Sequence, residues 1–193
     1  MALSLKIVVL LLLGLLALEK INAADTAPVT TVGPQDHLFM VKAAQASHAE
    51  IAAGKLAAQK GSTSEIRRFG EMMAAEHGKT YDELSNIAKA KGVMLPIQPD
   101  EGHQKLIKQL QSLENAEFDR LYVREAGIND HQVAVDLFLG QTKNGTDAEL
   151  RAFAEKTLPV IKQHLKMAQE LIGSSKARNG FHDQVAEFTG HSP

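Results

Sequence analysis

The sequence predicts an all-α protein built as a bundle of four long helices, with a short extra helix between the second and the third. Three observations predict this class. Ala, Leu, Lys, Glu and Gln dominate the composition, and these residues lose little side-chain freedom in a helix. Apolar residues recur at helical spacing in four long segments. Two tight glycine-containing turns and one long connection separate these segments, and nothing in the sequence favours a strand.

The first 35 residues are predicted to lie outside the bundle. Lys6 precedes an apolar run at residues 7–18, and small residues suited to cleavage follow up to Ala23, so residues 1–23 are expected to be a signal peptide. Residues 24–35 are small, polar and interrupted by proline, as in a linker. The chain has no cysteine, which excludes disulfides, a lipid-anchored N-terminal cysteine and covalent c-type haem.

The bundle domain is expected at residues 36–172, beginning with a helical hairpin. The first helix is predicted to run to Lys60, with Gly61 as a left-handed cap. Residues 62–65 match the capping box S/T-x-x-E, with Ser62 as the N-cap of the second helix. That helix presents an apolar stripe and ends at Gly92.

The second half of the domain repeats this plan. Apolar residues at helical spacing predict a short helix over residues 100–113, and the third long helix is expected from Asn115 to Asn144. Residues 146–149 form a second capping box, which opens a fourth helix expected to end at Ile172. Residues 173–193 are predicted to be a flexible tail. The connection of about two dozen residues permits the crossover topology of ferritin-like bundles, and a simple up-down order is the alternative.

Histidines are the most unusual feature of the predicted helices. Of the eight in the chain, four lie in the long helices, one in each: His48, His77, His131 and His164. At about 100° per residue, each leans toward the apolar face of its helix. Measured from the predicted turns, the first three lie at one height, whereas His164 is displaced from them by roughly 7–9 Å.

These histidines are compatible with a metal site, which bundle cores often contain. Met73 lies four residues before His77 and Met167 three residues after His164, so thioether sulfur accompanies two imidazoles. Soft sulfur with imidazole favours copper or another transition metal, or a b-type haem with His and Met ligands. The Glu-x-x-His pattern of ferritin-type di-iron enzymes is absent from the sequence.

Two other interpretations remain open for the same residues. The histidines can be buried polar residues with hydrogen-bonded rings, with Met73 and Met167 filling the core. They can also sense pH, because histidine titrates near neutrality. No phosphate loop, nucleophile elbow or HExxH motif is present, so an enzyme is not expected. A formal charge of −2 without a basic run argues against nucleic acid as a partner.

The chain resembles a bacterial family of unknown function, numbered 4142, of ferritin-like exported proteins often labelled predicted outer membrane proteins. The resemblance covers about residues 36–172. It is carried by residues 50–57 (EIAAGKLA), 69–77 (FGEMMAAEH), 117–123 (EFDRLYV), 130–131 (DH) and 157–165 (TLPVIKQHL). Glu76 stands where members usually have Asp. The resemblance implies a ferritin-like fold outside the cytoplasm, places His77, His131 and His164 at motif positions, and implies no established activity.

Together these observations predict a periplasmic, non-enzymatic helical bundle that acts as a binding or envelope-stress accessory protein, with possible peripheral association with the cell envelope. The alternative is a periplasmic protein that binds copper or haem through core His and Met residues.

Overall fold

The computed structural model describes residues 32–189, with side chains described for residues 32–173. Over that range the protein is all-α and contains no strand, which confirms the predicted bundle. The elements are α1 (Pro34–Lys60), α2 (Ser64–Ala90), α3 (Glu101–Ser112), α4 (Asn115–Tyr122), the π-helix η1 (Val123–Asp130), α5 (His131–Asn144) and α6 (Ala148–Thr189). The predicted signal peptide and residues 24–31 of the predicted linker lie outside the described residues. Among the described residues, no helix combines the length and hydropathy that crossing a bilayer requires.

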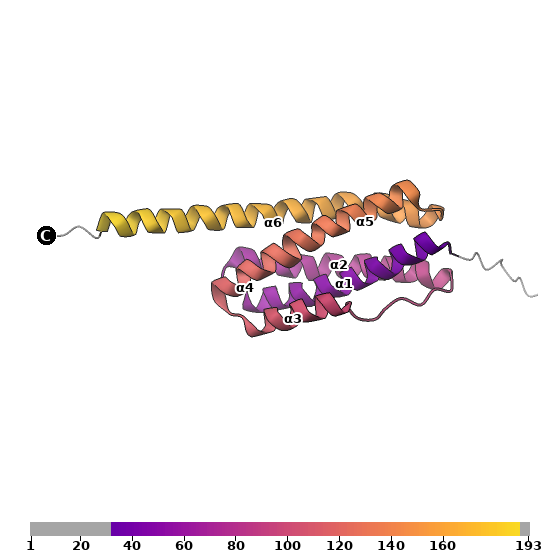
Figure 1. The fold of residues 1–193 in the computed structure, drawn as a ribbon, viewed down its shortest axis with the longest axis horizontal. Helices are drawn as coiled ribbons and strands as arrows, with labels where there is room; N and C mark the ends of the chain where they lie inside the picture. The colour runs from indigo at the N-terminus through magenta and orange to yellow at the C-terminus, as the bar shows by residue number, and fades with distance from the viewer. Residues whose placement is uncertain (1–31, 190–193) are drawn as a thin grey trace, which may run out of the picture.

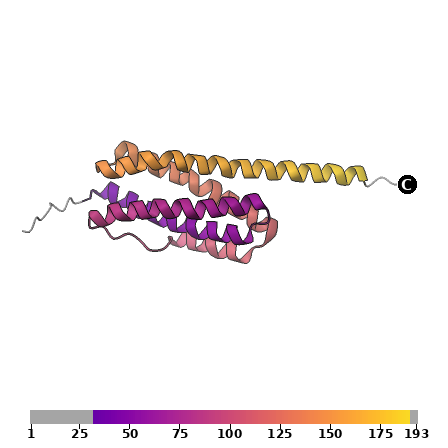
Figure 2. The same cartoon turned by 180° about the vertical axis from the view of Figure 1, so that it is seen from behind.

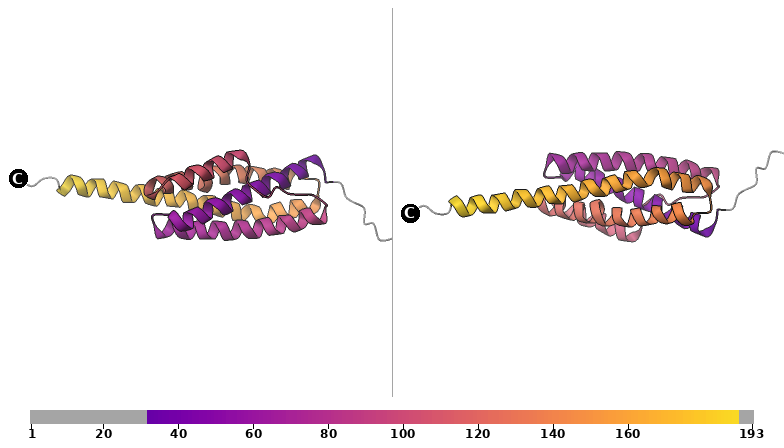
Figure 3. Two further views of the ribbon diagram at one scale, coloured as in Figure 1. Left: turned by 90° about the horizontal axis from the view of Figure 1, so that it is seen from below. Right: turned by 90° about the horizontal axis from the view of Figure 1, so that it is seen from above.

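Two helical hairpins lie side by side, and the connection between them travels the length of the bundle (Figures 1 and 2). At the end of α1, the Lys60 ammonium donates to the Gln111 carbonyl at 2.7 Å and pairs with Glu114, so α4 begins beside the α1–α2 turn. At the opposite end, Asp36 of α1 accepts from the backbone of Thr146, just before α6. The chain therefore has the ferritin-like crossover, with α3 as the predicted extra helix lying against α1 (Figure 3).

The last helix is longer than the sequence predicted. The fourth helix was expected to end at Ile172, yet α6 continues to Thr189 and extends past the other helices (Figure 1). Gly173 does not act as a cap here, since the residues after it include several good helix formers and no proline until Pro193.

Both capping boxes are shifted by one residue from their predicted positions. Thr63, and not Ser62, is the N-cap of α2, and its hydroxyl accepts from the Ile66 amide at 3.2 Å. Asp147 plays the same part for α6 by accepting from the Leu150 amide at 3.0 Å. Gly61 has φ −52°, so it is not the predicted left-handed cap. This position has no room for a side chain, since a Cβ there would lie 2.7 Å from the Ala57 carbonyl oxygen.

The first hairpin is held together by a close backbone approach between two glycines. A Cβ on Gly54 would lie 2.7 Å from the Gly70 carbonyl oxygen, and a Cβ on Gly70 would lie 2.6 Å from that of Gly54. Real Cβ atoms essentially never come so near, so any side chain at either position would force α1 and α2 apart. This contact fixes the rotation of α1 and thereby decides which of its residues face the bundle interior.

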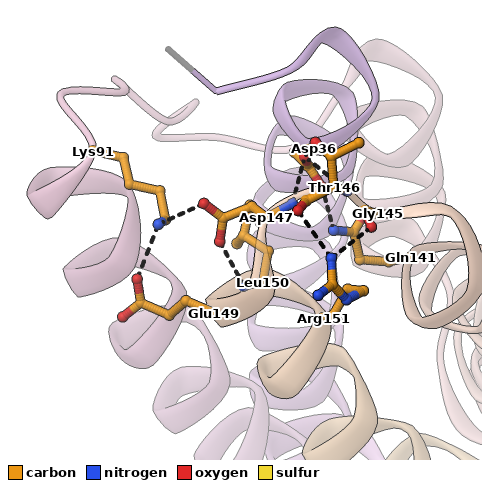
Figure 4. A network of polar contacts seen from close by, with 9 residues as sticks. All are labelled: Asp36, Lys91, Gln141, Gly145, Thr146, Asp147, Glu149, Leu150 and Arg151. Carbon is orange, nitrogen blue, oxygen red and sulfur yellow. Dashed lines mark hydrogen bonds and ion pairs between the residues drawn. The ribbon is translucent and has the colours of Figure 1, made fainter. Parts of the chain in front are cut away.

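A polar clamp closes the end of the bundle where α1 and α6 begin (Figure 4). The carboxylate of Asp36 is fully buried and accepts from the Gln141 amide at 2.6 Å, from the hydroxyl and amide of Thr146, and from the Asp147 amide at 3.0 Å. These hydrogen bonds to the charged form hold the pKa of Asp36 below its ordinary value, against the opposing effect of burial. Lys91 adds an ion pair with Asp147 at 2.7 Å.

The core consists of two apolar clusters with a polar layer between them. The cluster near the Asp36 clamp contains Phe39, Met40, Leu84, Phe138, Leu150 and Phe153 among others. The cluster near the α1–α2 turn contains Ala57, Phe69, Met73, Phe118, Tyr122 and Ala168 among others. The polar layer between the two clusters receives one buried polar residue from each long helix. These residues are Glu50, His77, His131 and His164. This layer, at mid-height of the bundle, is the candidate functional site.

Candidate metal centre

Three imidazoles from three different helices meet in the polar layer. His77 of α2, His131 at the start of α5 and His164 of α6 have ring centroids 5.4, 5.4 and 5.5 Å apart, a nearly equilateral arrangement. One nitrogen from each ring can be chosen so that all three lie within 4.8 Å of one another. All three side chains are buried, with 1–8% of their surface exposed. We call these residues the histidine triad.

The π-helix sets the orientation and the tautomer of His131. The i→i+5 spacing of a π-helix widens the turn, and η1 ends directly before this residue. His131 Nδ1 donates to the carbonyl of Ala126 at 2.8 Å, five residues earlier in the chain. A carbonyl can only accept, so the proton is on Nδ1 and the lone pair is on Nε2, which points at His77. Metal-binding histidines are commonly oriented by such a hydrogen bond from the ring nitrogen that does not bind the metal.

His164 is oriented by a carboxylate. Its Nε2 donates to Glu76 Oε2 across the α2–α6 interface at 2.7 Å. The lone pair of the neutral ring is then on Nδ1, which is fully buried and has no hydrogen-bond partner. A buried nitrogen without a partner is costly, and a metal ion would satisfy it.

His77 completes the triad and is electrically neutral. Its Nε2 lies 3.4 Å from His131 Nε2, so without metal the two nitrogens can share one hydrogen bond. Burial and the two neighbouring imidazoles lower the pKa of His77 well below its ordinary value. Burial, and more weakly His164, lower the pKa of His131 to about 4, although its bond to Ala126 opposes this. Both rings therefore keep their lone pairs at neutral pH, as metal ligands must.

Two members of the triad already have the nitrogen spacing of ligands to one small metal ion. Metal–nitrogen bonds of about 2.0–2.1 Å in tetrahedral or trigonal geometry place the ligand nitrogens roughly 3.3–3.6 Å apart. The observed 3.4 Å between His77 Nε2 and His131 Nε2 falls within this range. Centroids only about 5.5 Å apart leave room for an ion and not for a porphyrin, so the triad does not fit the haem interpretation.

A buried carboxylate beside the triad was missed from the sequence. Glu50 was expected to point away from the main stripe of α1, yet it is only 4% exposed and its Oε1 lies 3.8 Å from His131 Nδ1. Both its oxygens and the hydroxyl of Tyr122 are buried without a hydrogen-bond partner. Burial, reinforced by Asp130, raises the pKa of Glu50 well above its ordinary value. The backbone approach at Gly54 turns Glu50 inward, and a hydrophobicity pattern does not register this contact.

The remaining candidate ligands lie elsewhere. His48 was placed at the height of His77 and His131, but its ring lies against Tyr81, with centroids 4.4 Å apart, outside the triad. Met73 is fully buried in the apolar cluster near the α1–α2 turn. Met167 lines a surface groove together with Met72. The structure thus brings together His77, His131 and His164 and leaves His48 outside the triad, while the two methionines belong to the apolar cluster and to the groove.

The predicted displacement of His164 was wrong, since its ring lies beside that of His77 with centroids 5.4 Å apart. Its height was measured from Gly145, whereas α6 begins at Ala148. Three residues of helix correspond to about 4.5 Å, which accounts for roughly half of the expected offset.

The fold and this site define a class: helical-bundle proteins with a buried three-histidine centre. A family model, described as "Domain of unknown function (DUF4142)", matches residues 21–171. The chain belongs to this family, as its sequence motifs suggested.

Solved structures share the fold at low sequence identity. A DUF305 fragment from Deinococcus radiodurans is 13% identical, with a TM-score of 0.66, over 74% of this chain and 98% of that one. CopM in its Cu(I)-bound form is 16% identical, with a TM-score of 0.61, over 72% of this chain and 96% of that one. CopM in its Cu(II)-bound form is 17% identical, with a TM-score of 0.62 and the same coverage. A search of curated proteins found no match. At these identities the similarity shows the fold alone.

Proposed function

We propose that this protein binds a single copper ion through His77, His131 and His164. The observation that carries the proposal is the convergence of three buried imidazoles from three helices, with one nitrogen of each within 4.8 Å of the others. The buried Nδ1 of His164, which has no hydrogen-bond partner, supports it. Two of the rings are held in place by an acceptor on the side away from the lone pair, which is the Ala126 carbonyl for His131 and the Glu76 carboxylate for His164.

Copper is favoured over other metals by the donor set and its surroundings. Imidazole suits copper and zinc alike, but a hard ion such as Mg²⁺ or Ca²⁺ would require oxygen ligands, which do not complete this triad. A neutral, three-coordinate, water-poor site suits Cu(I), which carries one charge and tolerates trigonal geometry. The copper-bound forms of CopM, a protein with the same fold, support this choice.

Metal titration of the purified full-length protein tests the proposal. We expect one tightly bound Cu(I) per chain in anaerobic competition with a chromogenic chelator. His77→Ala and His164→Ala should each weaken binding at least tenfold, the order of a lost ligand, whereas His37→Ala should bind as the wild type because His37 is exposed and lies outside the triad. Circular dichroism confirms that each variant is folded. Wild-type protein that binds no copper, or binding that survives both triad substitutions, refutes the proposal.

The remaining functional expectations are part of the same proposal. We infer an extracytoplasmic, non-enzymatic accessory protein that holds copper at the cell envelope and does not bind nucleic acid. The signal-peptide pattern at residues 1–23 supports the compartment. The burial of the triad supports storage or buffering of an ion over turnover of a substrate. N-terminal sequencing of the mature protein, expected to begin at Ala24, tests the compartment.

A further inference from the structure

A surface groove lies between the two helices that carry His77 and His164. It has a volume of about 420 Å³ and is mostly apolar. Its walls include two methionines, Met72 from α2 and Met167 from α6, above the buried ring of Phe69. Both methionine residues are half-buried, and both line the groove.

The groove lies on one defined side of the triad. The helices α2 and α6 run in opposite directions, because α2 starts at the α1–α2 turn and α6 starts at the Asp36 clamp. Met72 precedes His77 and Met167 follows His164, so both methionines lie toward the α1–α2 turn. At 1.5 Å per residue they are about 7 Å and about 4–5 Å along their helices from these histidines. The groove is therefore next to the triad and not at a distant surface.

A partly exposed carboxylate one helical turn from Met72 contacts His164 directly. Glu76, which accepts from His164 Nε2, comes from α2 and has 40% of its side chain exposed, whereas His164 is buried. This contact connects the solvent-exposed side of the α2–α6 interface with the ring of His164.

Thioethers are soft, neutral ligands that select Cu(I) over Zn²⁺ and over hard cations. We propose that Met72 and Met167 form a surface docking site for Cu(I) that delivers the ion to the triad past Glu76. The proposal deepens the copper-binding function proposed above and rests on it for the delivery step. The docking step is independent of the triad, because the two thioether sulfurs would be its only ligands. No redox change is involved, since the ion remains Cu(I) throughout.

Loading kinetics test the delivery step. Stopped-flow transfer of Cu(I) from a chromogenic chelator to the apo-protein is compared for the wild type and the Met72→Leu/Met167→Leu double variant. Leucine preserves volume and apolarity while removing sulfur. We expect the double variant to load at least tenfold more slowly and to reach the same final stoichiometry. The matched control is Met94→Leu, which removes a thioether that is 93% exposed and lies outside the groove, and it should load at the wild-type rate.

Nuclear magnetic resonance of the methionine methyl groups tests the docking step in the wild-type protein, where folding of a variant is not at issue. Silver(I), a diamagnetic soft ion, should shift the methyl signals of Met72 and Met167 and leave that of Met94 in place. Unshifted signals of Met72 and Met167, or a double variant that loads as fast as the wild type, overturn the proposal. Shifted signals in a protein whose triad takes up no copper would instead refute the function proposed above and leave the surface site standing.

Discussion

The neutrality of His131 predicts that the metal-free protein loses stability in mild acid. The unfolded chain takes up a proton on this residue near the ordinary histidine pKa of 6.5, whereas the folded protein does so only near pH 4. Because the folded-state pKa is lowered, the stabilising contribution is complete above about pH 6.5 and declines as the pH falls toward about 4. His77, whose pKa is also lowered, adds to the decline in the same direction.

The size of the effect follows from the two pKa values. Between about pH 7.5 and pH 5, the unfolded state gains proton-binding free energy that the folded state does not, and for His131 alone the difference is roughly 2 kcal/mol. No reduction for solvent screening applies, because the side chain is only 1% exposed. The full loss, reached near pH 4, is about 3 kcal/mol.

Urea unfolding at both pH values measures the effect in chelator-treated protein. His131→Gln cannot titrate, so its free energy of unfolding should fall by roughly 2 kcal/mol less than that of the wild type between the two conditions. The comparison is between two pH values for each protein, so a lower absolute stability of the variant does not matter. His37→Gln, a change at an exposed position, should keep the wild-type dependence. A His131→Gln variant that declines as steeply as the wild type would refute the assignment of a neutral buried imidazole.

Three further substitutions test other parts of the structure by urea unfolding. Gly54→Ala should lower the free energy of unfolding by about 3 kcal/mol, because its Cβ would meet the backbone of α2. The control Gly78→Ala, whose Cβ would meet nothing within 4 Å, should be neutral or stabilising by about 0.5–1 kcal/mol. Equal effects of the two substitutions would contradict the close helix contact. Asp36→Ala should lower the free energy of unfolding by about 3–5 kcal/mol because several buried donors lose their acceptor. The control Asp136→Ala, at an exposed position, should lower it by less than about 0.5 kcal/mol. A small loss for Asp36→Ala would show that the clamp is not intact in solution. Glu50→Gln should stabilise the metal-free protein near pH 8 by more than about 1 kcal/mol. The reason is that a raised carboxyl pKa makes the stability of the wild type fall as the pH rises above about 4.5, whereas glutamine does not titrate. No gain in stability would show that this carboxylate has a partner.

The architecture could be predicted from the sequence because its signals are local. Helical periodicity and the two turns near Gly61 and Gly145 determine the hairpins, and the long connection permits the crossover. The triad members could be proposed for the same reason, since one histidine in each of four helices is visible in the sequence. The wrong predictions concern how α1 is rotated about its own axis. His48 was expected among the converging histidines, and Glu50 was expected to point away from the bundle interior.

The rotational errors have physical causes. In α1 the large residues Val41 and Ile51 suggested the inward face, but both are only partly buried. The true face is lined by small residues that allow close approach to α2, centred on Gly54. Hydrophobic patterns weight side chains by size and cannot detect a contact made by backbone atoms. They also miss that a charged residue can be turned inward by such a contact.

The π-helix has a consequence for the relation between sequence length and site assembly. Along the continuous helix formed by α4, η1 and α5, the buried residues Phe118, Tyr122 and Ala126 are four residues apart in the sequence. The next one, His131, follows Ala126 by five residues. The widened turn takes up the additional residue, so the buried side chains before and after it face the same side of the helix although their spacing in the sequence changes. Closing this turn into an uninterrupted α-helix without removing a residue would turn α5 by about 100° relative to α4 and carry His131 away from the other two histidines. The assembly of the three-histidine centre thus depends on the widening of a single turn, which composition and hydropathy do not encode.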